Sequence, residues 1–431
     1  VGFRNWDNGR HVADLAAIWN LNPMQIPHYA PPTHAMQIMR YAEKGSIRFL
    51  WVSATNPLVS LPELRRVREL LASQGLFLVV QDIFLTETAE LADVVLPAAT
   101  WGEKTGTFTN SDRTVHLSEK AVEPPGEARS DLDIFLDYAR RMGFRDNGGQ
   151  PFPQWHDPES AFEAWKRASA GRPCDYSGLS YDRLRGNSGV QWPCDEAHPE
   201  GTERLYTDGR FWARPEECES YGKDLVTGAP LEEPEYRAAN PDGRAMIKAV
   251  EYVPPHEEPG QEYPFALITG RTLYHFHTRT KTGRAPQLQR AAPEVWVEIA
   301  PPDAEEAGIR EGHPVEIRST RGRIHARARI SGIRPGVLFV PFHYGYWDTD
   351  TSEGDGERDR AANEMTVNDW DPVSKQPMFK VAAVQLRTLG QGDGQPSSAP
   401  TTTASAPVGA EVTATRGEPD TLEKYVDGGT R

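Results

Sequence analysis

Three short apolar runs near the start of this chain constrain its fold more than any other feature. The runs are residues 48–53, 76–80 and 94–97. Between the first two, Leu64, Val67 and Leu71 repeat at helical spacing, and Gly75 follows them. Apolar strands that alternate with helices are typical of a parallel sheet covered on both faces. The sequence therefore predicts an α/β, Rossmann-like domain over residues 1–145.

Two helix starts are expected in this domain. The first is Ser60, with Pro62 in the first turn of its helix. The second is Ser130, an N-cap residue that is followed by the acidic residue Asp131. The side chains expected on the apolar face of the second helix are Leu132, Phe135, Leu136 and Ala139.

Polar side chains follow the apolar runs at the points where strands are expected to end. Asn56 follows the first run, and Gln81, Asp82 and Thr86 follow the second. Ligands of parallel sheets bind beyond the carboxyl ends of the strands, so these side chains are candidates for a binding edge. Taken singly, each of them could instead cap a helix.

The pattern changes twice further along the chain. Residues 146–260 are rich in Gly, Pro, Trp and Tyr, which indicates a loop-rich inserted region. Residues 261–389 turn to short strands, with apolar and charged residues alternating around a turn at Arg321, as in an antiparallel hairpin. Short strands over such a length predict a small β-barrel. Residues 390–431 are dominated by Ser, Thr, Pro, Gly and Ala and are predicted to be a disordered tail.

A basic segment without carboxylates lies at the start of the β-rich part. Between Glu262 and Glu294 there is no Asp or Glu, although the formal net charge of the chain is -15. The basic residues of this segment are Arg271, His275, His277, Arg279, Lys281, Arg284 and Arg290. An apolar strand that runs into such a segment through Gly270 predicts a site for a strongly anionic ligand, such as a phosphorylated cofactor. The alternative is a solvated basic loop.

Bulk properties exclude several classes of function. No uninterrupted apolar run reaches membrane-spanning length, so no membrane span is expected. The sequence pI of about 5.3 argues against a nucleic-acid binder. Cys174, Cys194 and Cys218 are too few for a cysteine-only iron–sulfur or zinc site and give little support to disulfides. A cytoplasmic location fits this cysteine usage. The chain begins at Val1, so the absence of a signal peptide carries no information.

Several blocks follow one another in a fixed order along the chain. They are Ala54–Pro57, Gln81–Asp82, Thr86–Ala89, Ala92–Pro97, Trp101–Thr107 with Asn110 and Arg113, Gln191–Cys194, Gly270–Thr280, Asn363–Thr366, Asp371–Pro377 and Phe379–Lys380. The ordered set resembles the molybdopterin-dependent oxidoreductases of the dimethyl-sulfoxide reductase type, from about residue 45 to 387. The His277–Gly283 stretch and the Asn56–Pro57 turn are most similar to assimilatory nitrate reductases. Formate dehydrogenases share most of the other blocks.

This resemblance implies a molybdenum ion held by two molybdopterin guanine dinucleotides, a nearby [4Fe-4S] cluster and a C-terminal double-psi β-barrel that closes over both pterins. The residues that it places along one dinucleotide are Asn56, Gln81, Asp82, Lys104 and Asp131. Those that it places along the other are Gly270, Arg271, Thr272, His275, His277, Thr278, Arg279, Phe342, Asn363 and Lys380. For His275 and His277 the alternative is that the rings only pack at a strand end. Cys194 is expected to be a buried small hydrophobe and not the molybdenum ligand.

The family's four-cysteine cluster motif and its molybdenum-ligating thiolate or selenolate do not occur in this sequence. Both are expected upstream of Val1, so we expect the chain to be the C-terminal part of a longer enzyme and inactive alone. No catalytic residue and no metal ligand is assigned within it.

The implied activity is reduction of nitrate to nitrite, with electrons from a donor protein or reductase subunit. The first alternative is formate oxidation on the same scaffold. The second is a non-catalytic iron–sulfur subunit like that of respiratory complex I, against which the retained Arg271, Asn363 and Lys380 count. A stand-alone binding module is the third, and the unpaired hydrophobic sheet edge that it would expose counts against it.

Overall fold

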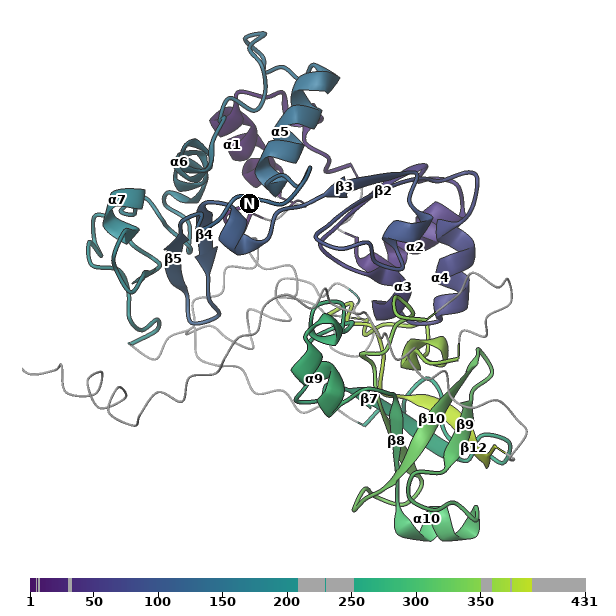
Figure 1. Cartoon of the computed structure of the whole chain (residues 1–431). Coiled ribbons are helices and arrows are strands. Elements are labelled where there is room, and N and C mark those ends of the chain that lie inside the picture. Colours follow the sequence, from purple (N-terminus) through teal and green to yellow (C-terminus); the bar gives the residue numbers. More distant parts are fainter. Residues whose placement is uncertain are drawn as a thin grey trace, which may run out of the picture.

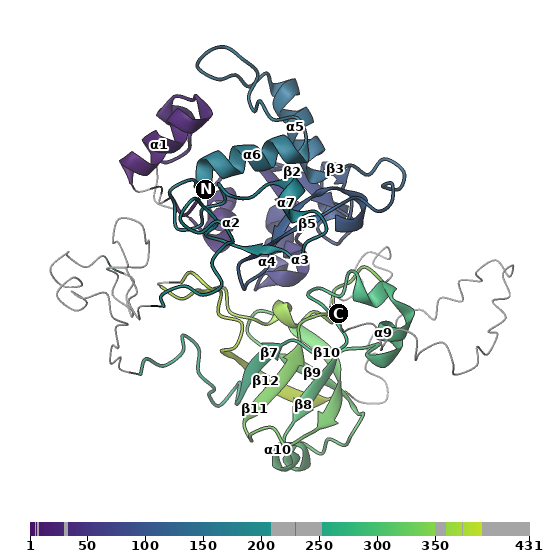
Figure 2. The same ribbon diagram turned by 90° about the vertical axis from the view of Figure 1, so that its left-hand side faces the viewer.

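A computed structural model describes residues 1–4, 6, 8–29, 33–207, 229, 252–349, 359–372 and 374–389. The predicted tail at 390–431, Cys218 and most of residues 208–251 lie outside the described residues. The described chain forms an α/β part and a barrel that packs beneath helices α3 and α4, as both views show (Figures 1 and 2). No helix within these ranges is long and apolar enough to cross a bilayer.

The predicted parallel sheet is present. Its strands are β1 (Phe49–Ser53), β2 (Phe77–Asp82) and β3 (Val94–Pro97), paired in the order β1-β2-β3. Helices α2 (Ala35–Glu43), α3 (Pro57–Ser60) and α4 (Leu64–Leu71) contribute to the apolar cluster under one face. In this cluster Leu78 and Val80 of β2 are fully buried beside Val67 and Leu71 of α4. The α/β interpretation of the sequence is therefore confirmed.

The predicted helix start at Ser60 is wrong, because the helix is divided into α3 and α4. Leu61 is extended (φ -85°, ψ 155°), since the residue before a proline is disfavoured in the α region. Glu63 is left-handed (φ 52°), and α4 begins only at Leu64.

The other face of the sheet is covered less than expected. Among the described residues, Phe135 and Tyr138 of α5 (Asp131–Met142) pack on Trp51, with ring centroids 5.2 and 5.1 Å away. Phe49 and Phe77 stack on each other and stay 46% and 48% exposed. Ser130 caps α5 as predicted, but Ile134 is buried and Phe135 is 45% exposed, so the predicted apolar face is only partly correct.

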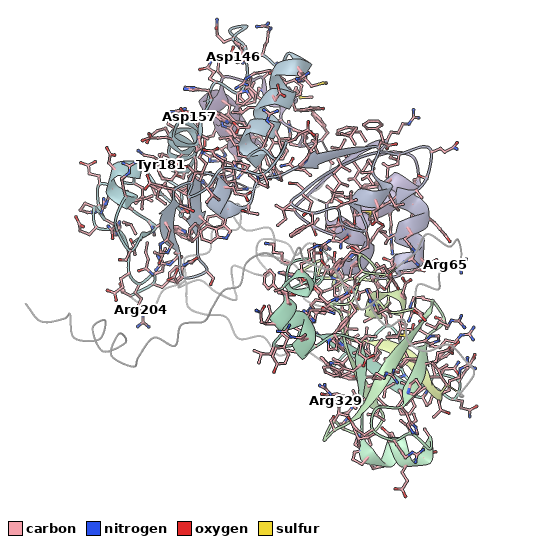
Figure 3. The ribbon with its side chains drawn as sticks, in the orientation of Figure 1. Arg65, Asp146, Asp157, Tyr181, Arg204 and Arg329 are labelled. Carbon is pink, nitrogen blue, oxygen red and sulfur yellow. The ribbon has the colours of Figure 1, made fainter. Side chains whose placement is uncertain are left out.

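A second, antiparallel sheet joins segments from both sides of residue 145. Its strands are β4 (Gly106–Thr109), β5 (Thr114–Ser118) and β6 (Val190–Gln191). The helices of this region are α1 (Gly9–Trp19), α6 (Pro158–Ser169) and α7 (Tyr181–Leu184). Tyr181 packs with Phe162 and Cys194 in one cluster, and Asp157 caps α6 (Figure 3). Cys194 is fully buried, which confirms its interpretation as a small hydrophobe.

The β-rich part is a closed barrel of six strands. In chain order they are β7 (Phe265–Gly270), β8 (Trp296–Ile299), β9 (Pro314–Arg318), β10 (Arg323–Ile330), β11 (Val337–Pro341) and β12 (Ala382–Thr388). The predicted hairpin is β9 with β10, where Ile317 pairs with Ile324 and both fill the core. Short helices flank the barrel, namely α9 (Pro286–Ala291) and α10 (Pro301–Glu306). The remaining short turns are η1 (Pro23–Gln25), η2 (Ala89–Leu91), η3 (Trp101–Glu103), η5 (Thr282–Arg284) and η6 (Ala362–Glu364).

Candidate functional site

A crevice of about 250 Å³ lies where the carboxyl edge of the parallel sheet meets the loop that follows β7. Its lining residues are Ala54, Thr55, Asn56, Ser60, Asp82, Ile83, Phe84, Thr86, Phe276, His277, Thr278, Thr280, Lys281 and Phe342. The predicted sheet edge, with Asn56 and Asp82, thus lies against the predicted basic segment, with His277 and Thr278. Asn56 and Asp82 lie 195 to 222 positions before His277 and Thr278 in the sequence.

The loop after β7 has an unusual backbone. His277 (φ 44°) and Arg279 (φ 64°) are left-handed, a conformation that side-chain-bearing residues rarely adopt. No acceptor within the described residues binds the backbone N–H groups of His277, Thr278, Thr280 and Lys281. Backbone N–H groups presented by such turns form concavities that bind anions. This stretch of loop therefore has the chemistry of an anion cradle.

Gly270 allows the loop to leave the barrel. A Cβ atom on Gly270 would lie 2.5 Å from a ring carbon of Phe339, so no other residue fits there without displacing that ring. The hydroxyl oxygen of the nearby Thr272 is buried and has no hydrogen-bond partner in the part of the chain that the structure describes. An orphaned buried hydroxyl of this kind fits a polar group of a bound ligand.

Burial disfavours the charged form of three histidines in this region. Burial lowers the pKa of His275, His277 and His343. His343 Nε2 accepts from Thr272 N at 2.8 Å, and its Nδ1 donates to the carbonyl oxygen of His277 at 2.6 Å, so one tautomer is fixed. Both ring nitrogens of His275 have partners inside the protein, Thr282 and Ala292, which is what the packing alternative predicts. His277, in contrast, lines the crevice.

Arg279 supports the loop from inside. Its side chain is fully buried, with one nitrogen bound to Asp348 at 2.6 Å and another to Gln289 at 2.8 Å. Burial alone would raise the pKa of Asp348, but Arg360 and Arg279 hold the pKa below its usual range. The predicted phosphate contact of Arg279 would thus be made by a guanidinium that already has two internal partners.

Sequence reasoning left two cations of the loop unassigned. Lys281 lines the crevice, and Arg284 lies over the rings of Phe84 (4.5 Å) and Trp347 (3.9 Å) beside it. Both belong to the acid-free segment, so the signal was present in the sequence. The sequence does not show which of these two side chains points toward the crevice.

The sheet side of the crevice is held by buried hydrogen bonds. Asn56 donates from Nδ2 to Glu87 at 2.8 Å and accepts at Oδ1 from the Thr88 hydroxyl at 2.7 Å. Asp82 accepts from Ile83 N at 2.7 Å. Burial raises the pKa of Asp82, and the backbone N–H groups of Phe84 and Ile83 only partly oppose the shift.

Gln81, Lys104 and Asp131 meet at a different place. Gln81 Nε2 donates to Asp131 Oδ1 at 2.7 Å, and Lys104 forms an ion pair with the other oxygen of Asp131. Lys104 and Asp131 line a second cavity, of about 580 Å³, whose walls are aromatic. The aromatic residues are Trp101, Phe108, Phe162, Trp165, Tyr176 and Tyr181. A charged pair at the rim of an aromatic cavity suits a flat polar ring such as a nucleobase.

Of the remaining predicted residues, Phe342 lines the crevice, whereas Asn363, Lys380, Arg271 and Thr272 do not. Asn363 donates to the carbonyl oxygen of Val59 at 2.8 Å, and Lys380 contacts the carbonyl oxygen of Thr269. Arg271 and Thr272 line a third cavity of about 680 Å³ on the barrel.

Two family models match this chain. Residues 13–141 match the molybdopterin oxidoreductase model, and residues 265–383 match the molydopterin dinucleotide binding domain. The second match contains the loop after β7 and most of the barrel.

Three relatives are similar over most of the chain. A nitrate reductase from Symbiobacterium thermophilum is 36% identical over 89% of the chain and 47% of the relative. An F420-dependent formate dehydrogenase subunit alpha from Methanocaldococcus jannaschii is 37% identical over 80% of the chain and 44% of the relative. An assimilatory nitrate reductase catalytic subunit from Bacillus subtilis is 32% identical over 89% and 48%. The chain thus spans about half the length of these relatives.

Among solved structures, acetylene hydratase from Pelobacter acetylenicus has the same fold. The TM-score is 0.58 at 18% identity, and the match covers 89% of this chain and 51% of that chain.

Proposed function

Since this chain belongs to the molybdopterin oxidoreductase family, we propose that it is the cofactor-cradling part of a molybdenum-dependent enzyme that reduces nitrate to nitrite. The observation that carries the proposal is the crevice, in which the sheet edge with Asn56 and Asp82 faces the N–H groups of the loop around Thr278. Nitrate is proposed as the substrate because the two nitrate reductases described above match 89% of the chain.

The ligand that fits these sites is the bis(molybdopterin guanine dinucleotide) form of molybdenum. Asn56 and Asp82 would hold it from the sheet side, and His277, Thr278 and Lys281 would hold its phosphates from the barrel side. Lys104 and Asp131 would hold a guanine ring in the aromatic cavity, where a carboxylate can accept from the base. Gly270, Arg271, Thr272, His275, Arg279, Phe342, Asn363 and Lys380 are proposed contacts or supports of the same ligand, and Gln81 supports Asp131.

When bound, this cofactor supplies the two-electron chemistry by which nitrate, with two protons, becomes nitrite and water. The chain itself binds and orients the group. The His277 ring can donate or accept a hydrogen bond, whereas Lys281 supplies the positive charge that phosphate needs. Phe342 and Phe276 keep part of the crevice wall apolar, which limits the entry of water.

The proposal extends to partners and location. We propose a [4Fe-4S] cluster in the same enzyme, an electron-donor protein or reductase subunit, and a cytoplasmic site of action. Cys174 and Cys194 both lie in a buried cluster, and burial raises the pKa of each thiol, so neither is suited to hold iron. Cell fractionation with an antibody to the barrel tests the compartment.

Formate oxidation is the second candidate, because the formate dehydrogenase subunit is 37% identical to this chain. Two assays of the complete enzyme separate the candidates. Nitrite formed from nitrate with reduced viologen supports the first, and its absence rejects it. Formate-dependent dye reduction without nitrate turnover supports the second. Metal analysis that finds no molybdenum would favour a non-catalytic subunit instead.

A further inference from the structure

A buried carboxylate behind the crevice links the two sides of the site. Glu87 is 6% exposed. Its Oε2 accepts from Asn56 Nδ2 at 2.8 Å, and its Oε1 accepts from the backbone N–H groups of Tyr346 at 2.5 Å and Trp347 at 3.0 Å. The first partner belongs to the sheet edge, and the other two belong to the loop that follows β11 of the barrel.

The partners of Asn56 fix the orientation of its amide group. Both oxygens of Glu87 act as acceptors, Oε1 from two backbone N–H groups and Oε2 from Asn56, so Asn56 turns Nδ2 and not Oδ1 toward Glu87. Thr88 Oγ1 accepts from Leu58 N at 3.1 Å, so its hydroxyl hydrogen is available to Asn56 Oδ1 at 2.7 Å. The flipped amide would set an oxygen against the Glu87 carboxylate, and it would lose the bond from Thr88.

One hydrogen on Asn56 Nδ2 remains after these bonds, and Asn56 lines the same crevice as His277, Thr278, Thr280 and Lys281, whose backbone N–H groups have no acceptor among the described residues. We propose that Glu87 is a positioning residue, which holds the Asn56 amide so that its second N–H is offered to an anionic ligand in the crevice. The inference rests on the proposed function, because the ligand in question is the phosphorylated pterin cofactor.

Through the same carboxylate, the position of the second Asn56 N–H group depends on how the barrel packs against the sheet. A Cβ atom on Gly345 would lie 2.2 Å from Glu87 Oε1 and 2.6 Å from a methyl group of Val59, so only glycine lets the barrel loop approach this closely. With the barrel docked, Tyr346 N and Trp347 N hold one oxygen of Glu87 while the other holds Asn56. Docking and ligand recognition therefore share one side chain.

Glu87→Gln separates these two tasks. A glutamine can still accept from Tyr346 N and Trp347 N through its carbonyl oxygen, but its NH2 group then faces Asn56 Nδ2, and two donors oppose each other. We expect the variant holoenzyme to hold its cofactor about 10-fold or more weakly, as for a lost hydrogen bond to a charged group. The readouts are molybdenum and released pterin per chain after dialysis. Backbone amide exchange at Tyr346 and Trp347 should stay as in the wild type.

Glu364→Gln is the matched control. Glu364 is a carboxylate of the same interface and is 3% exposed, but its partners are Arg68 and the Tyr346 hydroxyl, and it has no bond to Asn56. This control should lower the unfolding temperature and, because it leaves the hydrogen bonds of the Asn56 amide in place, should weaken cofactor retention less than Glu87→Gln does. Equal retention in wild type and Glu87→Gln would overturn the inference. So would a loss of retention that occurs only together with faster exchange at Tyr346 and Trp347.

A second readout needs no cofactor. In protein labelled with ¹⁵N-asparagine, one Asn56 side-chain hydrogen should exchange slowly, and the other should shift when inorganic pyrophosphate is added. Both features should disappear in Glu87→Gln, and their persistence would contradict the inference. A wild-type protein that shows both features but contains no molybdenum or pterin would reject the proposed function while supporting the role of Glu87.

Discussion

Asn363 donates from its side-chain nitrogen to the carbonyl oxygen of Val59 at 2.8 Å, across 304 positions of sequence. The carboxylate of the next residue, Glu364, accepts hydrogen bonds from both terminal nitrogens of Arg68, at 2.5 and 2.9 Å. Both contacts join the η6 turn, which lies between β11 and β12, to helices α3 and α4 beside the sheet. These bonds hold the barrel against the two helices that lie beside the sheet.

The Arg68–Glu364 pair should be needed for this docking. Arg68→Ala leaves the carboxylate of Glu364, only 4% exposed as a side chain, without its charged partner. Breaking a buried pair in this way costs about 3–5 kcal/mol, so a clear fall in the free energy of unfolding is expected by denaturant titration. Arg65→Ala is the control. Arg65 lies on the outer side of α4 (Figure 3), 76% exposed in its pair with Glu69, and should change stability by less than about 0.5 kcal/mol.

Gly270→Ala should displace the start of the loop. The added methyl would overlap the Phe339 ring, and overpacking of this kind costs about 1–3 kcal/mol. Thermal unfolding measures the loss. The double variant Gly270→Ala/Phe339→Leu removes the ring and should recover part of it. Gly332→Ala, where nothing lies within 4 Å of the new atom, should have almost no effect.

Lys281 should contribute affinity for anions. Lys281→Ala removes a cation that lines the crevice, and binding of inorganic pyrophosphate, measured by calorimetry, should weaken by about 10-fold, as for loss of a charge-assisted hydrogen bond. Lys120→Ala is the control, because that lysine pairs with Glu123 in an exposed position. Equal weakening by the two variants would mean that only net charge matters and that the crevice is not the anion site.

Stability should respond to pH through His325. This buried histidine bridges Asp359 at 2.6 Å and Glu316 at 3.4 Å, and Glu316 also pairs with Arg387 at 2.8 Å. The bond to Asp359 is the largest cause that raises the pKa of His325 above its usual value of 6.5. The folded state then binds the proton more tightly, so this stabilisation is complete below pH 6.5 and is lost as pH rises through the raised pKa.

The pH effect is measured as a difference. Unfolding temperatures of the wild type and His325→Gln are compared between pH 6 and 9. Burial lowers the pKa of His275 and His343, so these residues change stability with pH in the opposite direction to His325. Because both proteins contain them, their effect cancels in the comparison. The difference in unfolding temperature between the wild type and His325→Gln should shrink as pH rises. An advantage that grows with pH would show that His325 is neutral in the fold.

The sequence by itself determined the elements and their class. Apolar runs fixed β1, β2 and β3, and the alternation on either side of Arg321 fixed the β9–β10 hairpin, because side-chain periodicity reports directly on which face is buried. The acid-free segment also predicted an anion site in the loop after β7. The predicted helix start at Ser60 is wrong because Pro62 disfavours the helical conformation of Leu61, and this restriction outweighs the apolar spacing that suggested one helix.

Only the tertiary structure decided how the site is assembled. It placed Asn56 against Glu87, Glu87 against the barrel loop, and Arg279 inside the protein rather than at its surface. It also separated Lys104 and Asp131 into a cavity of their own. Local patterns record whether a residue prefers to be buried, but these contacts depend on how the barrel packs on the sheet. That packing is a property of surfaces built from residues hundreds of positions apart, and no short window of sequence contains it.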